Sequence, residues 1–496
     1  MKNPKIYFPF LFAVFPILFL LSHNKEELSF NVVFLSIVSS LFAVALMILV
    51  LYVLFQSWHR GALFVFFITF IFFSYGHFCR LIPEHTFFSR GILIGRDKLL
   101  YTIIIFLTAA FFFFVRKIKK ETLFSLTKLL NWVTFFLALL VLLQIGIYKS
   151  FWFFKLFKIN STSKKAAREI IVPKTNQPDI YYIILDTYAR SDVLKNLYNF
   201  DNSKFENLLR TKGFYIPRDS KSNYAITFLS LASSLNMEYI NYLTEEIGLN
   251  SGNRSLPYKM IKDSRVREFL KTRGYRIINF RSGWGPTHND ELADQQLGPW
   301  NANEFITVLF ETTLLLPWEF KIIGNPARER ILYAFRTIGQ LAREPGPKFI
   351  LAHFLVPHSP YLFGRHGEVV TGLEYNLGGG ENKKRYYINQ LIFVNKKISE
   401  MVEQILNNSK QKPIIILQAD HGAFDIDENI RFKIFSAFYL PGIGNEFNFP
   451  SITPVNIFRI IFNHYFGANF PLLENHCFYS LYSSPYRFSE LNSPDL

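Results

Sequence analysis

Five long apolar segments precede residue 150, and they constrain the fold more than any other feature of this chain. Each reaches or approaches the roughly 20 residues that a helix needs to cross the hydrocarbon core of a bilayer. We therefore predict five transmembrane helices in residues 1–150, an odd number that places the two ends of the chain on opposite sides of the membrane. The segments are Ile6–Leu21, Phe30–Phe55, Ala62–Phe78, Leu99–Val115 and Leu129–Tyr148.

The first segment has one alternative interpretation, a signal peptide, because Lys2 and Lys5 precede a short apolar run. No small-x-small cleavage site follows it, which favours an uncleaved span. The positive-inside rule gives a small net preference for a cytoplasmic N-terminus, since the short loop RKIKKE (116–121) would then face the cytoplasm. Four basic residues count against this orientation, because they lie in the loop between the third and fourth predicted spans, which would then be outside the cytoplasm: Arg80, Arg90, Arg96 and Lys98.

The charge of the chain is concentrated in its membrane part. The 496 residues carry a formal net charge of +16, and residues 1–168 hold 19 Lys and Arg against 5 Asp and Glu. Charges beside membrane spans attract anionic lipid headgroups, whereas a nucleic-acid partner would need a basic stripe on the soluble domain. We therefore expect membrane lipid and no nucleic acid as a partner. Residues 151–170 are assigned to a juxtamembrane linker or interfacial helix.

From about residue 171 the sequence changes to short apolar runs, separated by segments of helical period such as Tyr387–Leu406. Near-continuous apolar strands alternating with amphipathic helices are typical of a parallel sheet covered by helices on both faces. We predict an α/β catalytic domain over residues 171–496. Its predicted strands are Asp179–Asp186, Tyr275–Phe280, Lys348–Val356, Pro413–Asp420 and Phe435–Pro441.

Side chains that can bind a metal follow three of these strands. Asp186 ends the first strand, and Asp420 and His421 end a later one. His353 lies within or at the end of a third strand, with His358 just past it. Ligands of parallel sheets bind at the carboxyl ends of the strands. Each residue alone is more often a helix cap or a core histidine, but together their oxygen and nitrogen atoms suit zinc, manganese or magnesium.

A candidate nucleophile lies in SNYAITFLSLASSLNMEY, residues 222–239. Phe228, Leu231 and Leu235 have the spacing of a buried helix face, and Thr227 lies near the predicted helix start, where the helix dipole favours an anion. A threonine hydroxyl becomes a good nucleophile only when a metal or a base lowers its pKa, so a metal site beside Thr227 would be chemically sensible. Spacing alone leaves open that this is a polar helix face with ordinary caps.

Four motifs, taken in order, resemble those of the alkaline phosphatase and sulfatase superfamily: ILD (184–186), SNYAITFLSLASSLN (222–236), HFLVPHSPY (353–361) and ADHG (419–422). The five spans before them are similar to the membrane-anchored branch of that superfamily, which includes lipoteichoic acid synthases and phosphoethanolamine transferases. The resemblance implies an alkaline-phosphatase-like catalytic domain outside the cytoplasm of a multi-pass protein of the cytoplasmic or inner membrane. It also implies a metal site made by Asp186, Thr227, Asp420 and His421, with Thr227 as the nucleophile.

The resemblance further implies phosphorus chemistry. True sulfatases carry a Cys or Ser in the motif C/S-x-P-S-R, which does not occur in this sequence. The expected reaction is attack by Thr227 on a phosphodiester, followed by transfer of a phospholipid-derived headgroup to a membrane or envelope glycan or lipid acceptor. The cofactor would be one or two divalent ions, manganese, zinc or magnesium. The alternative is hydrolysis, by an extracytoplasmic phosphodiesterase or sulfatase-like hydrolase.

Other residues are candidates for binding substrate or a second ion. His358 matches a family position of this kind, and His353 lies on the same strand segment. The segment RSGWGPTHND (281–290) follows a predicted strand and could bring Arg281 or His288 to an anionic substrate, although it could equally be a turn-rich loop. His476 could be a late ligand, but its surroundings favour a surface position.

Two other classes of function remain open at this point. One is a transporter-like or scaffold protein whose soluble domain only binds a ligand, and polar residues inside the spans would support it. Asn131 and Gln144 are the main residues of this kind. The other is a catalytically silent relative that retains the fold but has lost turnover.

Overall fold

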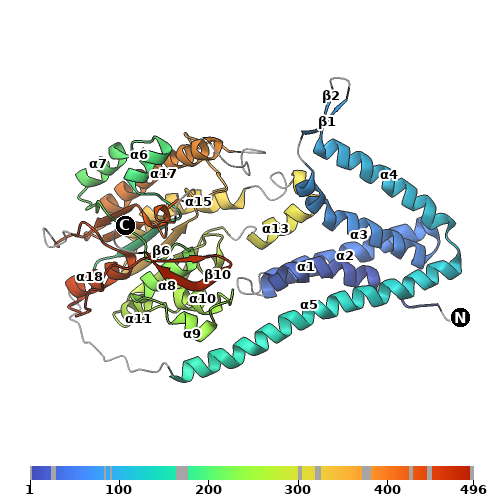
Figure 1. Cartoon of the computed structure of the whole chain (residues 1–496), viewed down its shortest axis with the longest axis horizontal. Helices are drawn as coiled ribbons and strands as arrows, with labels where there is room; N and C mark the ends of the chain where they lie inside the picture. The colour runs from blue at the N-terminus through green and yellow to red at the C-terminus, as the bar shows by residue number, and fades with distance from the viewer. Residues whose placement is uncertain are drawn as a thin grey trace. The chain divides into compact units, whose positions relative to one another are not determined.

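The computed structural model divides into two compact units, Met1–Arg168 with Ala302–Gly324, and Glu169–Asn301 with Asn325–Leu496 (Figure 1). The second unit is thus interrupted by a segment that packs with the first, a separation that the sequence pattern did not suggest. The residues that the structure describes are 3–23, 30–82, 85–89, 92–162, 177–299, 304–318, 325–370, 381–423, 428–443 and 449–491.

The first unit is mainly helical. Four of its helices contain stretches long and apolar enough to cross a membrane: Val33–Phe55, Trp58–Leu81, Arg96–Lys117 and Lys120–Ile147. The predicted first span forms a shorter apolar helix of 16 residues, so the structure supports four of the five predicted spans by length and composition. The elements are α1 (Phe8–His23), α2 (Phe30–Phe55), α3 (Trp58–Leu81), β1 (His85–Ser89), β2 (Ile92–Gly95), α4 (Arg96–Lys117), α5 (Lys120–Thr162), α13 (Glu304–Thr312) and η1 (Leu316–Trp318).

Asn131, the polar residue predicted inside a span, caps the start of α1. Its Oδ1 accepts hydrogen bonds from the backbone N–H groups of Tyr7 (3.3 Å) and Phe8 (3.0 Å), and its Nδ2 donates to the carbonyl of Lys5 (2.7 Å). The first N–H groups of a helix have no partner within the helix, and leaving them unpaired in a membrane is costly. Asn131 therefore has a structural role that needs no transport pathway.

A six-stranded sheet forms the centre of the second unit, in the order β5-β4-β6-β3-β7-β8. All neighbouring pairs are parallel except β7 and β8, which are antiparallel. The predicted mixed α/β, parallel-rich architecture is confirmed, while the short strand β5 was not predicted. The strands are β3 (Ile180–Leu185), β4 (Arg276–Phe280), β5 (Gln295–Leu297), β6 (Lys348–Phe354), β7 (Ile414–Gln418) and β8 (Ser436–Tyr439).

Helices cover both faces of this sheet (Figure 1). The main apolar core lies under the first face, where Tyr181, Ile183 and Leu185 of β3 pack with α6 (Ser191–Tyr198), α7 (Ser203–Thr211), α15 (Pro326–Thr337), η2 (Ile338–Arg343) and α17 (Glu381–Asn408). On the other face the ring of Tyr182 meets that of Phe458 at 5.2 Å. The helices of that face are α8 (Thr227–Asn236), α10 (Ser255–Lys262), α11 (Arg265–Lys271) and α18 (Pro454–Phe466). Burial from both sides explains why the central strands are almost entirely aliphatic or aromatic.

Smaller elements complete the unit: α9 (Leu243–Ile247), α12 (Gly285–His288), η3 (Ile430–Phe432) and the antiparallel pair β9 (Phe478–Leu481) and β10 (Ser484–Glu490).

The strand register places the chemistry-bearing residues on one face. Ile184 of β3 pairs with His353 of β6 on one side and with Gln418 of β7 on the other. Because side chains alternate between the faces of a sheet, Asp186 and Asp420, two residues further on, belong to the same face as His353. Tyr182 also belongs to this face, and its hydroxyl lies 3.0 Å from that of Ser234 in α8. The face is therefore the one that α8 covers.

Candidate functional site

Two aspartates and a histidine meet at the carboxyl edge of the sheet. Asp186 follows β3, and Asp420 and His421 follow β7, and all three are buried. Nε2 of His421 lies 3.8 Å from Oδ1 of Asp186 and 3.5 Å from Oδ2 of Asp420. One ligand atom from each of the three residues lies within 4.8 Å of the others. Adjacent parallel strands thus bring together residues that are more than 230 positions apart in the chain.

The backbone next to Asp186 is held in an unusual conformation. Thr187 has φ of 62°, a left-handed value that costs a β-branched residue about 1–3 kcal/mol. Its N–H donates to Oδ1 of Asp420 (3.3 Å), and its carbonyl accepts from the hydroxyl of Tyr387 (2.8 Å). The strained residue therefore fixes one oxygen of Asp420 and leaves Oδ2 of that carboxylate facing Asp186 and His421.

Thr227 is the first residue of α8, and its hydroxyl reaches this group. Oγ1 of Thr227 lies 3.3 Å from Nε2 of His421. The preceding residue, Ile226, is extended (φ −128°, ψ 130°), so the helix starts at the threonine. Thr227 is partly exposed, whereas Asp186, Asp420 and His421 are buried. The hydroxyl is thus the member of the group that is open to a ligand.

His353 borders the same space from β6. Its Nε2 lies 3.9 Å from Oδ2 of Asp186, and its Nδ1 lies 3.0 Å from the hydroxyl of Thr287. The indole ring of Trp284 packs edge-on against the imidazole, with the ring centroids 5.5 Å apart. Thr287 and Trp284 hold the ring so that Nε2 faces the aspartates.

Three buried polar atoms in this group have no hydrogen-bond partner: Oδ1 of Asp186, Oδ2 of Asp420 and Nε2 of His353. Unpaired buried polar atoms are rare in folded proteins, and buried charges are normally paired or coordinate a metal. Carboxylate oxygens, imidazole nitrogens and a hydroxyl are ligands that zinc, manganese and magnesium accept. The residues present therefore fit a divalent cation.

The ionisation of these groups follows from burial. Burial, followed by the negative charge of Asp420, raises the pKa of Asp186 well above its usual value. For Asp420, burial acts in the same direction but is outweighed by His421 and His353, so its pKa is lowered. Burial also lowers the pKa of His421, and it lowers the pKa of His353 to about 4. The neutral imidazoles and the carboxylate of Asp420 are in the protonation states that metal binding requires, whereas Asp186 would release its proton when a cation binds.

The other candidate residues, His358, Arg281 and His288, have different surroundings. His358 is partly buried, and it lies close enough to His421 and Asp420 to interact with them electrostatically. Burial lowers the pKa of His358 to about 4. Arg281 lines a small cavity of about 10 Å³ together with His353 and Arg330. Nδ1 of His288 accepts a hydrogen bond from the N–H of Gly283 (3.1 Å).

His476, the residue considered as a late ligand, is different. Its imidazole is 36% exposed and contacts Glu490 at 2.5 Å and Glu474 at 3.5 Å. These contacts fit the surface role that the sequence analysis favoured.

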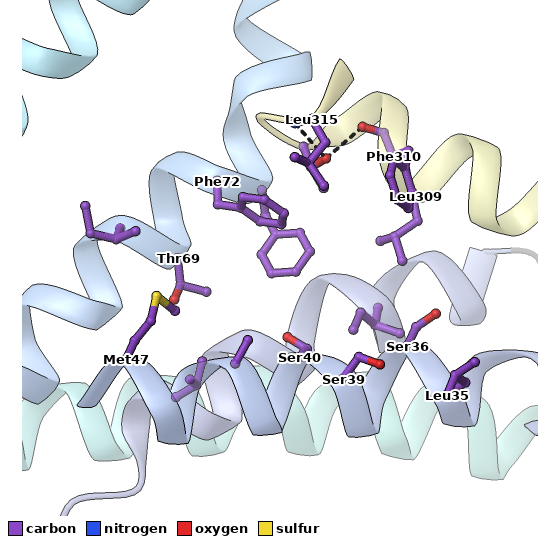
Figure 2. A pocket seen from close by; sticks show the side chains of 16 residues that line it. Leu35, Ser36, Ser39, Ser40, Met47, Thr69, Phe72, Leu309, Phe310 and Leu315 are labelled. Atoms are coloured by element: carbon purple, nitrogen blue, oxygen red, sulfur yellow. Dashed lines mark hydrogen bonds between the residues drawn. The ribbon is translucent and has the colours of Figure 1, made fainter. Parts of the chain in front are cut away.

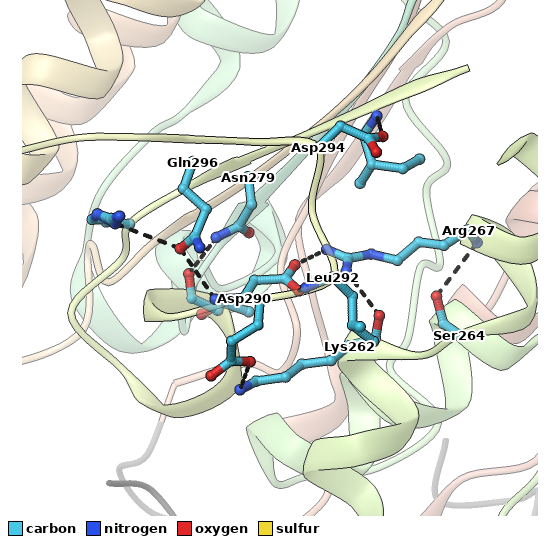
Figure 3. A network of polar contacts seen from close by, with 12 residues as sticks. Lys262, Ser264, Arg267, Asn279, Asp290, Leu292, Asp294 and Gln296 are labelled. Carbon is cyan, nitrogen blue, oxygen red and sulfur yellow. Dashed lines mark hydrogen bonds and ion pairs between the residues drawn. The ribbon is translucent and has the colours of Figure 1, made fainter. Parts of the chain in front are cut away.

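A buried ion pair holds the loop that carries Thr287. The guanidinium of Arg267 in α11 binds the carboxylate of Asp290, and both side chains are almost fully buried (Figure 3). Asp290 also accepts from the N–H of Leu292 (3.2 Å), and Nη1 of Arg267 donates to the carbonyl of Lys262 (2.8 Å). The loop between β4 and β5 is therefore anchored to α11 next to the residues that orient His353.

Three further residues support the site and were not identified from the sequence. Thr287 bonds to His353, and Oγ of Ser230 donates to the carbonyl of Asp420 (2.7 Å). Nη2 of Arg431 donates to the carbonyl of Ala225 (2.9 Å), just before the start of α8. Only Ser230 had a signal in the sequence, since it lies three residues after Thr227 on the same helix.

Gly422, the last residue of the ADHG motif, lies where two backbone segments come close together. A Cβ atom added there would lie 2.7 Å from the carbonyl oxygen of Ile430 and 2.8 Å from that of Lys433. Its N–H donates to the carbonyl of Arg431 at 2.6 Å. Glycine is required here because two backbone segments approach each other beside His421, and not because of a positive φ.

Comparison with known proteins gave matches only among solved structures; no family model and no curated protein matches the chain. The C-terminal periplasmic domain of EcEptC from Escherichia coli, in complex with Zn, is 12% identical with a TM-score of 0.41, covering 59% of this chain and 84% of that one. The integral membrane lipooligosaccharide phosphoethanolamine transferase A (EptA) from Neisseria meningitidis is 12% identical with a TM-score of 0.36, covering 89% of each chain. A putative sulfatase from Bacteroides thetaiotaomicron is 13% identical with a TM-score of 0.38, covering 60% of this chain and 72% of that one.

The matched structures are thus a periplasmic domain of EptC, a phosphoethanolamine transferase that is an integral membrane protein, and a putative sulfatase. At such low identity, what the site of this chain does has to be inferred from its own residues.

Proposed function

We propose that this protein is a membrane-bound, metal-dependent phosphotransferase that uses Thr227 as its nucleophile. It would take a headgroup from a phospholipid and pass it to a glycan or lipid acceptor of the membrane or envelope. One observation carries the proposal: a partly exposed hydroxyl at a helix start lies 3.3 Å from His421, next to two buried carboxyl groups that each have an oxygen without a hydrogen-bond partner.

Asp186, Asp420, His421 and the Thr227 hydroxyl would hold the divalent ion, and His353 and His358 are the candidates for a second ion or for substrate. A divalent ion bound there lowers the pKa of a hydroxyl and neutralises negative charge that develops on phosphoryl oxygens. The N-terminus of α8 adds the positive end of a helix dipole at the same place. Both contributions favour a phosphate ester as substrate.

The reaction has two steps. In the first, Oγ1 of Thr227 forms a bond to the phosphorus of the phospholipid while the bond from phosphorus to the glycerol oxygen breaks. Diacylglycerol leaves with the proton that the threonine hydroxyl gives up, and the headgroup phosphate stays esterified to Thr227. In the second step an acceptor hydroxyl forms a bond to the same phosphorus while the bond from phosphorus to Oγ1 of Thr227 breaks, and the acceptor's proton returns to Oγ1. Water in place of the acceptor would give hydrolysis.

The membrane part supports a lipid substrate. We propose five spans, with α1 as the first, and a cytoplasmic N-terminus, which together place the catalytic domain outside the cytoplasm. The domain limits proposed are 1–150 for the spans, 151–170 for the juxtamembrane linker and 171–496 for the catalytic domain. Basic residues next to the spans attract anionic lipid by about 1 kcal/mol each. An anchor of this size keeps the site near the bilayer, where lipid donors and lipid-linked acceptors are concentrated.

Topology can be tested on intact cells. Protease added from outside should cleave the part of the chain that contains residues 177–299. Complete protection of that part, with cleavage only after permeabilisation, would reverse the proposed orientation.

Transfer and hydrolysis can be distinguished with purified protein and a phospholipid labelled in its headgroup. Transfer predicts that label moves to an added membrane glycan or glycolipid acceptor. A covalent intermediate on Thr227 favours transfer, because it can persist until an acceptor hydroxyl binds in place of water. Label released only as the free headgroup phosphate, at a rate that no acceptor alters, would identify a phosphodiesterase instead.

A further inference from the structure

The first unit contains a groove that the proposed function does not explain. It has a volume of about 560 Å³ and is lined by α2, α3, Ile17 of α1 and the segment 309–315, which runs from the last turn of α13 into the residues after it (Figure 2). Figure 2 shows Ser36, Ser39 and Ser40 along α2, with Phe72 of α3 and Leu309 across the groove from them. Its size is that of a pocket for a small molecule or for part of a larger one.

The third wall of the groove, segment 309–315, packs directly against α3. A Cβ atom on Gly76 of α3 would lie 1.8 Å from the carbonyl oxygen of Glu311, so the two backbones touch because residue 76 has no side chain. The N–H of Leu314 donates to the carbonyl of Phe72 (2.8 Å), and Arg80 pairs with Glu311 (3.1 Å). Close backbone contact through a glycine is how helices pack tightly in membranes. The groove is therefore closed by a fixed segment.

The lining of the groove is apolar apart from hydroxyl groups. None of its 16 described lining residues carries a charge. Three of the hydroxyls are already used: those of Ser40, Thr69 and Thr313 donate to the carbonyls of residues 13, 65 and 310. Ser36 and Ser39 are partly or fully exposed, so their hydroxyls can meet a ligand.

The lining residues of α2 lie at different depths in the membrane. Ser36 and Ser39 lie in the first two turns of the span Val33–Phe55, whereas Met47 lies eleven residues beyond Ser36, roughly 16 Å deeper. The start of a span lies at the boundary between the hydrocarbon core and the headgroup region. The groove thus has the hydroxyls of Ser36 and Ser39 at the depth of lipid ester groups, and at the depth of lipid tails it has apolar side chains and the hydroxyl of Thr69, which is paired within its own helix (Figure 2).

We propose that this groove binds one acyl chain of a glycerophospholipid, and that Ser36 and Ser39 donate hydrogen bonds to its ester oxygens. The surrounding solvent of a membrane-spanning helix is lipid, and exposed hydroxyls in hydrocarbon are costly unless they find an acceptor. An ester carbonyl supplies that acceptor, and a hydrocarbon chain matches the deeper wall. This site is separate from Asp186 and Thr227 and goes beyond the proposed function, which assigns no lipid contact within the helices.

Photo-crosslinking tests the proposal. The full-length protein is placed in vesicles of phosphatidylethanolamine and phosphatidylglycerol that contain phosphatidylglycerol with a diazirine on one acyl chain. After illumination, labelled peptides are mapped by mass spectrometry. We expect enrichment on 35–47, 68–73 and 309–315 over the lipid-exposed residues Ile105 and Phe106 of α4, which report ordinary bilayer contact.

Two matched variants make the test specific. Ala43 lines the groove and Ala45 does not, although both are exposed on the same helix. Ala43→Trp should fill the groove and reduce this enrichment roughly tenfold, while Ala45→Trp should leave it unchanged. If both variants behave alike, or if the three segments are labelled no more than α4, the proposal is wrong.

The hydroxyls are tested separately. The double variant Ser36→Ala with Ser39→Ala should weaken labelling by roughly sevenfold, if each lost hydrogen bond contributes about 0.6 kcal/mol, as hydrogen bonds between membrane helices do. A free fatty acid with the same diazirine should label the groove poorly because it lacks the glycerol ester, and equal labelling would contradict a glycerophospholipid site. Thr227→Ala should label like the wild type, so a failure of the proposed enzyme activity would not be mistaken for a failure of this site.

Discussion

Oγ1 of Thr227 lies 3.3 Å from Nε2 of His421, and this contact joins the start of α8 to the end of β7 across the candidate site. The threonine is partly exposed and the histidine is buried. The arrangement separates the two tasks that a phosphoryl-transfer site needs: buried residues hold a charge in place, and an accessible hydroxyl meets the substrate.

The first prediction concerns metal content. The purified protein should contain about one divalent ion per chain or more, and Asp420→Ala should lower that content at least roughly tenfold because a buried ligand is lost. Asp219→Ala is the matched control, since the Asp219 side chain is 40% exposed and pairs with Arg218 at the surface. Elemental analysis gives the measurement. Wild-type metal content in both Asp420→Ala and Asp186→Ala would rule out the proposed site.

The second prediction concerns Gly422. The added methyl group of Gly422→Ala would meet two backbone carbonyl oxygens at 2.7 and 2.8 Å, so the backbone beside His421 has to move. We expect a loss of about 1–3 kcal/mol of stability, as for other overpacked sites, together with reduced activity. Thermal unfolding measures the first effect. Gly252→Ala should be neutral because a Cβ atom there meets nothing within 4 Å, and equal effects of the two substitutions would contradict the prediction.

The third prediction concerns the buried pair Arg267 and Asp290. Arg267→Met leaves the carboxylate buried without its partner, which typically costs about 3–5 kcal/mol. Arg265→Met, two residues earlier in α11, removes an exposed pair with Glu238 and should cost less than about 1 kcal/mol. Chemical unfolding of the full-length protein compares the two. A loss of similar size in both would mean that the buried pair does not anchor the loop.

The fourth prediction concerns acid stability. Burial, together with Arg330 and Arg281, lowers the pKa of His288 from 6.5 to about 4. Below pH 6.5 the unfolded chain binds a proton that folded His288 does not, so stability should fall as the pH drops from 6.5 towards 4, by up to about 3 kcal/mol. In His288→Asn, whose amide oxygen can still accept from Gly283, this part of the loss should disappear. Unfolding curves across that pH range test it, and an unchanged acid slope would assign the loss to other groups.

Much of the site could be predicted because its signals are local in the sequence. The aliphatic runs that end in Asp186 and Asp420 identify central strands, and the rule for parallel sheets then places both acids at the same edge. The spacing around Thr227 indicated a helix start, and α8 begins at that residue. The motif resemblance added the expected roles.

The remaining features depend on tertiary contacts that leave no local pattern. Strand β5 has three residues, all only partly buried, and so lacks an apolar run. The described residues 304–318 are rich in apolar side chains like the strands, and their contacts with α3, such as those of Glu311 with Gly76 and of Leu314 with Phe72, group them with the first unit. Thr287 became part of the site because the loop folds back onto His353.

Covalent labelling of Thr227 tests the central claim most directly. The purified protein is incubated with headgroup-labelled phospholipid without acceptor, quenched in acid and analysed by mass spectrometry of its peptides. We predict that the headgroup phosphate is found on Thr227, that it is absent after metal removal with a chelator, and that Thr227→Ala loses both the adduct and all label movement. Thr227→Ala protein that still moves label at the wild-type rate would contradict the account.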